Sequence, residues 1–227
     1  MKLVIIVPAF NEAPVIRKVL VALKKEIASL GEVEIVVVDD GSVDATAKEA
    51  MTAGAKILSH PINRGLGGAL GTGLTYAKLV NADIAVTFDA DGQHDPGDIR
   101  RVIEPIRKGD ADVVIGSRTL KGMQQIPFDR RIILWFGNVI TKLLFSVSTS
   151  DSQSGFRAFS KPAIRQISLK TQEMEASSEF FSEINRLSLQ LTEVPIHVIY
   201  TSYSRKKGQS NLNAFGILGR LLLKLAR

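Results

Sequence analysis

The residues best suited to chemistry lie within positions 84–96, where an apolar run is followed by Asp89 and Asp91. Side chains alternate between the two faces of a strand, so carboxylates at this spacing converge on one cation only where the chain leaves the sheet. Gly92 permits such a turn. Hard cations prefer oxygen ligands, and one or two carboxylates commonly hold Mg²⁺ together with substrate phosphates. The sequence therefore predicts that Asp89, Asp91 and Gln93 bind Mg²⁺ or Mn²⁺ carrying a substrate diphosphate.

A structural explanation covers only part of this segment. Asp95 stands where a helix N-cap is expected, because Pro96 would occupy the first helical position. That explanation gives Asp89 and Asp91 no role, so the metal hypothesis is preferred. For His94 two interpretations stay open, contact with a phosphate or a structural role.

The elements that must position these residues follow a regular alternation. We expect strands over residues 3–7, 34–38, 56–58, 84–88 and 111–115. Between them we expect helices over residues 11–31, with Asn11 as cap, over residues 42–53 and 65–79, and from residue 96. This order predicts an α/β fold, a doubly wound and mostly parallel sheet, which binds ligands at the carboxyl ends of its strands.

Beyond Ser117 the alternation stops. We expect helices over residues 130–145, 177–191 and 212–226, a strand over 194–200, and a tight loop over 154–157. There is no internal repeat or linker. We therefore expect a single domain over residues 1–227, in which residues 118–227 elaborate a site formed by residues 1–117.

Composition narrows the partners and the compartment. The net charge of +6 and the pI near 9.6 favour an anionic partner. The few aromatic residues are not interleaved with the basic ones, which argues against nucleic acid. The chain has no cysteine, and we find neither a signal peptide nor an apolar stretch near the roughly 20 residues that span a bilayer. We expect a cytoplasmic protein.

Other polar clusters follow the expected strands. Asp39 and Asp40 end an apolar strand, where an acid can accept a hydrogen bond from a base or a ribose hydroxyl, although turn chemistry alone is the alternative. Arg118 is placed to pair with a phosphate in a bidentate manner. Further basic or hydroxyl residues follow it, and they predict a second phosphate site or, alternatively, solvated charges: Arg130, Arg131, Ser154 and Arg205.

The motifs PAFNE, VVVDDGS, DADGQHDP, GSR, QSGFRAF, EVPI and YSRKKGQSN occur in this order over nearly the whole chain. In this series the chain resembles the family 2 glycosyltransferases of the GT-A fold, and within them the dolichyl-phosphate mannosyltransferase group. The resemblance implies a nucleotide-sugar half over residues 1–117 and an acceptor half, facing a membrane, over residues 118–227. It also implies inverting transfer of a sugar, mannose from GDP-mannose, to a dolichyl or other polyprenyl phosphate.

By the same resemblance, each group of residues has an implied role. The nucleotide would be bound by Pro8, Phe10, Glu12, Asp39, Asp40, Asp89 and Ala90. The metal would be bound by Asp89, Asp91 and Gln93, with Asp91 and Arg118 catalytic. The acceptor phosphate would be bound by Arg118, Arg130, Arg131, Ser154 and Arg205.

The proposed sugar transfer is also chemically consistent when the family resemblance is set aside. A phosphate monoester has a second pKa of about 6, so at neutral pH the acceptor is already a nucleophile and needs no general base. A lipid acceptor also implies peripheral contact with the cytoplasmic face of a membrane, for which the apolar residues of 132–145 and the basic helix over 212–226 are candidates. The alternatives are burial of these helices against the domain's own core or a dimer partner.

Three alternative functions remain at this stage. The first is the same reaction with a UDP-sugar carrying glucose or N-acetylglucosamine. The second is a haloacid-dehalogenase-like phosphatase with Asp89 as nucleophile, and the third is a non-catalytic module that binds nucleotide sugars. The sequence leaves the oligomeric state open.

Overall fold

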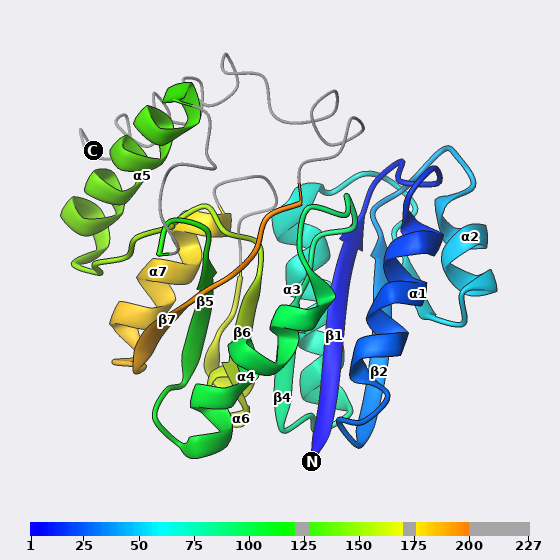
Figure 1. Cartoon of the computed structure of the whole chain (residues 1–227), viewed down its shortest axis with the longest axis horizontal. Coiled ribbons are helices and arrows are strands. Elements are labelled where there is room, and N and C mark those ends of the chain that lie inside the picture. The colour runs from blue at the N-terminus through cyan, green and yellow to red at the C-terminus, as the bar shows by residue number, and fades with distance from the viewer. Residues whose placement is uncertain (121–127, 170–175, 200–227) are drawn as a thin grey trace.

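One sheet runs through both halves of the chain. In a computed structural model, which describes residues 1–120, 128–169 and 176–199, seven strands lie in the order β3-β2-β1-β4-β6-β5-β7. They are β1 (Lys2–Ala9), β2 (Glu32–Asp39), β3 (Lys56–Ser59), β4 (Ile84–Thr87), β5 (Val113–Ser117), β6 (Arg157–Ser160) and β7 (Leu191–Pro195). Neighbouring strands are parallel, except that β6 runs antiparallel to β4 and β5 (Figure 1). The predicted doubly wound, mostly parallel sheet is confirmed.

Helices cover both faces of this sheet because the side chains of β1 alternate. Leu3 and Ile5 pack with the helices of one face, and Val4 and Ile6 pack with those of the other. The first face is covered by α1 (Ile16–Ile27), α2 (Thr46–Thr52) and α4 (Ile99–Lys108), and the second by α3 (Gly65–Leu79), α6 (Lys161–Gln166) and α7 (Ala176–Arg186). A 3-10 turn η1 (Pro96–Asp98) precedes α4, and α5 (Phe128–Phe145) lies beside α7, apart from the sheet (Figure 1).

The second face is packed closely against α3. A Cβ atom added at Gly73 would lie only 2.2 Å from a methyl carbon of Ile6 on β1. No side chain therefore fits between this helix and the central strand at that point. This close approach fixes the distance between α3 and the sheet at that point. The first residues of α3 follow the carboxyl end of β3.

Two helix starts differ from the sequence prediction. Asn11 does not cap α1, which begins at Ile16, but has a positive φ of 52°. Its side-chain oxygen instead accepts a hydrogen bond from the backbone N–H of Val43 at 3.0 Å. Ser42 likewise does not begin α2, because its hydroxyl accepts from the backbone N–H of Asn11 at 2.9 Å. Two hydrogen bonds between these loops thus replace the cap expected at Asn11 and the helix start expected at residue 42.

The second half contains larger corrections. Residues 154–157 were expected to form only a tight loop, yet Arg157 starts β6, which inserts between β4 and β5. Helix α7 ends at Arg186 rather than 191, because Ser188 adopts a positive φ of 52° and turns the chain. Leu191 then begins β7 opposite Val113, ahead of the expected strand over 194–200. The helix expected over residues 212–226 lies outside the described residues.

Candidate active site

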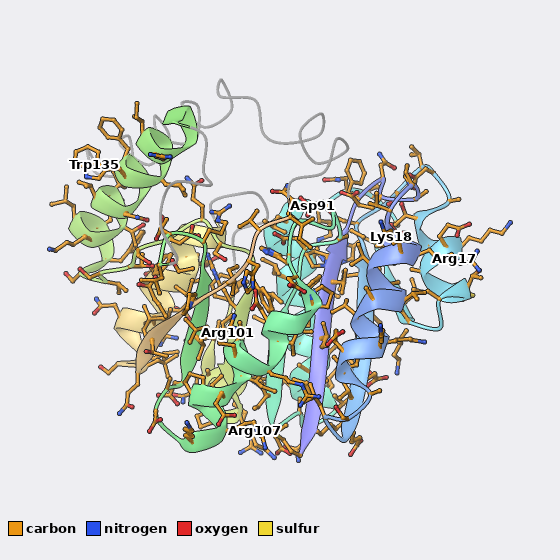
Figure 2. All side chains as sticks on the ribbon, viewed as in Figure 1. Arg17, Lys18, Asp91, Arg101, Arg107 and Trp135 are labelled. Carbon is orange, nitrogen blue, oxygen red and sulfur yellow. The ribbon has the colours of Figure 1, made fainter. Side chains whose placement is uncertain are left out.

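The carboxyl ends of the parallel strands meet at one edge of the sheet. Strands β1, β2, β4 and β5 end there, and the antiparallel β6 begins there (Figure 1). Figure 2 shows Asp91 at this edge and Arg107 at the opposite one. The sheet therefore brings together the polar clusters that the sequence places after separate strands.

Asp89 follows β4 and is held on two sides. Its Oδ2 lies 2.9 Å from Nε2 of the buried His94. On the other side the backbone of Gly155 approaches so closely that a Cβ atom there would lie 2.4 Å from Oδ1. The carboxylate is nevertheless 37% exposed, so it reaches the surface of the site in a fixed orientation.

The charges around Asp89 favour its ionised form. Burial has the largest single effect and opposes ionisation, whereas the charge interaction and hydrogen bond with His94 favour it. The guanidinium groups of Arg118 and Arg157 act in the same direction, so the pKa of Asp89 lies below its ordinary value. The acid after β4 and the basic residues after β5 therefore share one electrostatic environment.

Asp91 directly precedes Gly92. Gly92 has a positive φ of 75° and forms the turn that the sequence predicted. The Asp91 carboxylate accepts from the backbone N–H of Gln93 at 2.9 Å and from the Gln93 side-chain amide at 2.6 Å. Burial and the charge of Asp89 raise the pKa of Asp91 above its ordinary value, although both Gln93 bonds act against this. The structure thus contains two neighbouring carboxylates whose repulsion disfavours full ionisation of the second.

The loops after β1 and β2 form the next part of the edge. Besides the contacts of Asn11, the backbone N–H of Glu12 donates to the Thr46 hydroxyl at 2.8 Å. Glu12 is buried, whereas Phe10 is 41% exposed beside it. Pro8 and Ala9 belong to β1 and are half-buried and buried respectively. The predicted nucleotide residues of this segment are therefore grouped at the carboxyl end of β1.

Asp39 and Asp40 have different surroundings. Asp39 accepts one long hydrogen bond, from the backbone N–H of Ser42 at 3.3 Å. Oδ1 of Asp40 lies 2.6 Å from Nδ1 of His60 and accepts from the backbone N–H of Arg64 at 2.9 Å. Asp40 thus ties the loop before α3 to the end of β2. Of the two acids, Asp39 has fewer internal partners.

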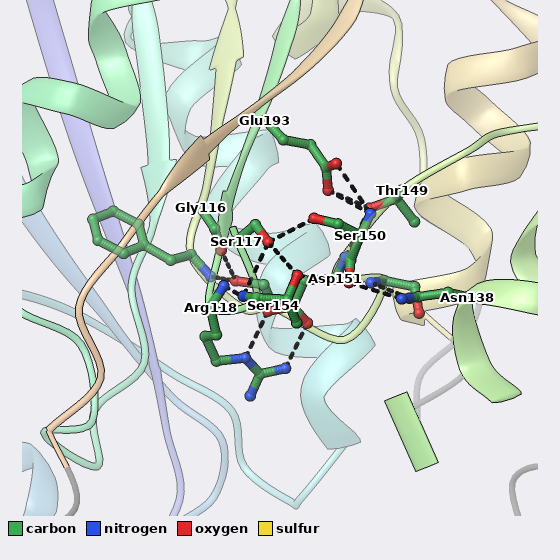
Figure 3. Close-up of polar contacts among 12 residues, drawn as sticks. Gly116, Ser117, Arg118, Asn138, Thr149, Ser150, Asp151, Ser154 and Glu193 are labelled. Carbon is green, nitrogen blue, oxygen red and sulfur yellow. Dashed lines mark hydrogen bonds and ion pairs between the residues drawn. The ribbon is translucent and has the colours of Figure 1, made fainter. Parts of the chain in front are cut away.

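Arg118 follows β5 and forms a two-pronged ion pair. Its Nε and Nη2 donate to the two carboxylate oxygens of Asp151 at 2.7 and 2.6 Å, and its backbone N–H donates to Oδ2 at 3.0 Å (Figure 3). Asp151 is fully buried, while the Arg118 side chain is 21% exposed. Sequence reasoning predicted a bidentate pair of Arg118 with phosphate, and in this structure Asp151 occupies that bidentate edge.

The loop that carries Asp151 is held by hydrogen bonds to β7 and α5. Glu193 accepts from the Thr149 hydroxyl at 2.6 Å and from the backbone N–H of Ser150 at 2.9 Å. The Asn138 side chain of α5 donates to the Ser150 carbonyl at 2.7 Å (Figure 3). Neither Asp151 nor Glu193 was predicted as a site residue. The sequence signals for these two acids were their positions: Asp151 lies two residues before the QSGFRAF motif, and Glu193 is the first residue of the EVPI motif.

Arg157 is a basic residue near the site that sequence reasoning did not predict as a site residue. Its side chain is buried at the start of β6, donates to the carbonyls of Ser154 and Ser152, and lies over the Phe180 ring at 4.8 Å. Burial lowers the pKa of Arg157 to about 10, although Asp151 and Asp89 favour its charged form. It supplies a fixed positive charge behind the site.

The other predicted phosphate residues have different positions. Ser154 is fully buried and its hydroxyl donates to the Gly116 carbonyl at 2.6 Å, so here it ties β5 to the loop before β6. Arg130 and Arg131 lie in the first turns of α5. Arg205 lies outside the described residues. A phosphate-binding role stays a prediction for all four.

A separate group of ligand-type atoms lies away from Asp89 and Asp91. Within the described parts of the chain, Asp95, Asp98 and His197 bring their atoms within 4.8 Å of one another. Asp98 already pairs with Arg101 and accepts from the backbone N–H of His197 at 2.6 Å. Asp95 caps η1 as predicted, by accepting from the Gly97 N–H at 2.9 Å. The polar contacts within this group account for its geometry.

Comparison with known families gives the site its context. The family model described as glycosyl transferase family 2 matches residues 4–168, which contain the acids after β1, β2 and β4 and the Arg118–Asp151 pair. The chain belongs to glycosyl transferase family 2. It is therefore a glycosyltransferase, and the phosphatase alternative, which rested on the Asp-x-Asp pattern alone, is wrong.

Two curated relatives are similar to this chain over almost their full lengths. A UDP-N-acetylglucosamine–dolichyl-phosphate N-acetylglucosaminyltransferase of Methanococcus voltae is 38% identical, covering 96% of this chain and 94% of the relative. An undecaprenyl-phosphate mannosyltransferase of Micrococcus luteus is 30% identical, covering 100% and 93%. Both are named as transferases to a polyprenyl phosphate.

Among solved structures, glucosyl-3-phosphoglycerate synthase of Mycobacterium tuberculosis resembles this glycosyltransferase with a TM-score of 0.72. The match covers 98% of this chain and 79% of that one at 20% sequence identity. That enzyme was crystallised with Mn²⁺, UDP and its product. The likeness confirms the GT-A fold.

Proposed function

We propose that this glycosyltransferase transfers a hexose from a nucleoside diphosphate sugar to a polyprenyl phosphate, with inversion at the anomeric carbon. The observation that carries the proposal is that Asp89, Arg118 and Arg157 lie at one edge of the sheet. There the charges of the two arginines lower the pKa of Asp89. One half of the edge offers carboxylates for a cation and a diphosphate. The other half offers positive charge for a second, separate phosphate.

The carboxylate half fits a divalent metal. Its donors are the carboxylate oxygens of Asp89 and Asp91, the ligand type that Mg²⁺ and Mn²⁺ prefer. Gln93 donates its side-chain amide to Asp91 at 2.6 Å, so it would have to turn this amide to offer its oxygen to a metal. Burial and proximity to Asp89 disfavour the charged form of Asp91, and a bound cation would act against both effects. When bound, the metal would stabilise negative charge on the leaving diphosphate.

The basic half fits the acceptor. A phosphate dianion can attack the anomeric carbon directly, forming the new carbon–oxygen bond as the bond to the nucleoside diphosphate breaks. Arg118, which Asp151 holds in a fixed position through Nε and Nη2, would orient that dianion by its positive charge. Arg157, buried behind the loop, would reduce repulsion between the two anionic substrates. No residue is needed as general base.

The nucleotide is assigned to the ends of β1 and β2. Phe10 is exposed there and offers a ring face, and Asp39 has fewer internal hydrogen bonds than Asp40. Pro8, Glu12 and Ala90 complete the proposed contacts. We keep two donors. GDP-mannose follows from the motif resemblance, and UDP-N-acetylglucosamine is favoured by the name of the 38% identical relative.

A lipid acceptor requires contact with a membrane surface, and α5 offers it. Trp135, Phe136 and Leu143 of this helix are 61%, 46% and 73% exposed. Figure 2 shows Trp135 on the side of α5 that faces away from the sheet. Among the described residues, none of the helices combines the length and apolar character that crossing a membrane requires. We propose peripheral binding at the cytoplasmic face of a membrane.

The test is a donor panel. The protein is incubated with Mn²⁺ or Mg²⁺, a short polyprenyl phosphate and labelled GDP-mannose, UDP-N-acetylglucosamine or UDP-glucose, and the organic phase is counted. We expect a labelled lipid with one donor and its loss in Asp91→Asn. Failure with every donor, accompanied by metal-dependent nucleotide binding, would instead support the non-catalytic binding module.

A further inference from the structure

His94 has surroundings that differ from those of an ordinary core residue. Its ring is 4% exposed and packs against the rings of Phe88 and Phe156, with centroid distances of 5.5 and 5.2 Å; these two rings also contact each other. From this apolar pocket one ring nitrogen, Nε2, reaches the Asp89 carboxylate at 2.9 Å. A carboxylate oxygen can only accept, so Nε2 carries the proton and donates.

The second ring nitrogen has a different environment. In the described portion of the chain, Nδ1 of His94 is buried and has no hydrogen-bond partner. A buried polar atom without a partner destabilises a folded protein. An apolar side chain of similar size, packed against the same two phenylalanine rings, would avoid this destabilisation. The contribution of His94 to fold stability therefore does not explain why a histidine stands here. Its contact with Asp89 does.

The carboxylate that His94 contacts is restrained from the opposite side as well. The Gly155 backbone lies so near Oδ1 and Oδ2 of Asp89 that an added Cβ would lie 2.4 and 2.5 Å from them. The backbone limits how far the carboxylate can retreat, and the Nε2 hydrogen bond fixes its rotation. Together they set the direction in which Asp89 presents its exposed oxygen.

We propose that His94 is a positioning residue that orients Asp89 for divalent metal binding by donating from Nε2 to Oδ2. The proposal rests on the metal role assigned to Asp89 above. Ligands of a bound metal are commonly oriented by such outer hydrogen bonds, and loss of one typically weakens metal affinity by about 10- to 100-fold. His94 itself touches neither the metal nor the substrate in this assignment.

The experiment compares His94→Leu, which fills the pocket without a donor, with His94→Gln, whose amide nitrogen can replace Nε2. Affinity for Mn²⁺ is measured by the electron paramagnetic resonance signal of the free ion, without sugar donor or acceptor. Thermal unfolding is followed on the same samples. His197→Gln is the control, because His197 contacts Asp98 and lies outside the proposed site.

We expect His94→Leu to weaken Mn²⁺ binding by about 10- to 100-fold while its melting temperature stays equal to or above that of the parent. His94→Gln should recover most of the affinity, and His197→Gln should bind as the parent does. Parent-like Mn²⁺ affinity in His94→Leu would overturn the positioning role, as would equal loss of affinity and melting temperature in both His94 variants. Absence of Mn²⁺ binding by the parent would overturn the proposed metal site itself.

Discussion

Replacement of Gly155 by alanine tests the geometry of the site with a single methyl group. The added Cβ would lie 2.4 Å from Oδ1 of Asp89, whereas an ordinary contact begins at 3.4 Å, so the carboxylate must retreat by about 1 Å. Asp89 is a short side chain with one oxygen held by His94, which leaves it little freedom to turn away. Gly155 lacks a positive φ, so alanine itself fits the backbone.

A displacement of about 1 Å at a reacting centre can reduce the rate about 100-fold, which corresponds to about 2.7 kcal/mol of transition-state stabilisation. The free energy of unfolding should change far less, because the steric conflict is relieved at a partly exposed carboxylate. We therefore expect Gly155→Ala to fold and to lose nearly all transfer of label into the organic phase.

Gly71→Ala is the matched control. The same methyl group added at Gly71, inside α3, meets Leu169 at an ordinary 3.8 Å. Alanine in a helix is favoured over glycine by about 0.5–1 kcal/mol, so this variant should be at least as stable as the parent and fully active. Full activity in Gly155→Ala would refute the reasoning, since the carboxylate position would then not matter. So would an equal loss of activity in Gly71→Ala.

Three further predictions concern charge and surface. Asp151→Asn removes the charge that pairs with Arg118 and faces Arg157, and should lower the free energy of unfolding in urea by about 3 kcal/mol, whereas Glu104→Gln at an exposed pair should change it by less than about 1 kcal/mol. Trp135→Glu on α5 should reduce co-sedimentation with anionic vesicles several-fold, and Leu79→Glu, at another exposed apolar residue on α3, should not. Equal binding of both variants would contradict the role of α5. Hydrogen bonds from the backbone of Lys2 and from Lys161 lower the pKa of Asp83 below 3.8, so its stabilising effect is present above that pH and lost as the pH falls through the lower folded-state value. The difference in melting temperature between the parent and Asp83→Asn should therefore be present at pH 7 and should shrink progressively as the pH falls below 3.8, and a difference independent of pH would show that the charge is not responsible.

The first half of the fold was predictable because its signals are local. The apolar run of β1 and the turn at Gly92 follow from residue types a few positions apart. Helix α3 begins and ends at the predicted residues, Gly65 and Leu79. Strand β6 was missed because its short run 157–160 starts with a charged residue, and its burial depends on pairing with β4 and β5. Nothing in the neighbouring sequence encodes that pairing.

The same distinction applies to the site. Asp89 and Asp91 could be selected from their spacing after a strand, which depends on local geometry. The pairing of Arg118 with Asp151 could not be predicted, because the two residues are 33 positions apart. The serine-rich loop that carries Asp151 and precedes β6 also has no periodicity. From the sequence, a single arginine at a strand end predicts a contact with a phosphate as well as it predicts an ion pair with a carboxylate of the protein. Only the fold shows which anion already occupies its bidentate edge.

The antiparallel strand β6 explains how the two halves of the site are held in register. The Thr87 hydroxyl of β4 donates to the Gly155 carbonyl at 2.7 Å, and Gly155 also lies against the side chain of Asp89, two residues after Thr87. The same loop carries Asp151, which holds Arg118. The proposed metal ligand and the proposed phosphate ligand are therefore joined by hydrogen bonds and ion pairs to adjacent strands of one sheet. In the proposed reaction, the separation between the leaving diphosphate and the attacking phosphate would therefore follow from the pairing of β4, β6 and β5.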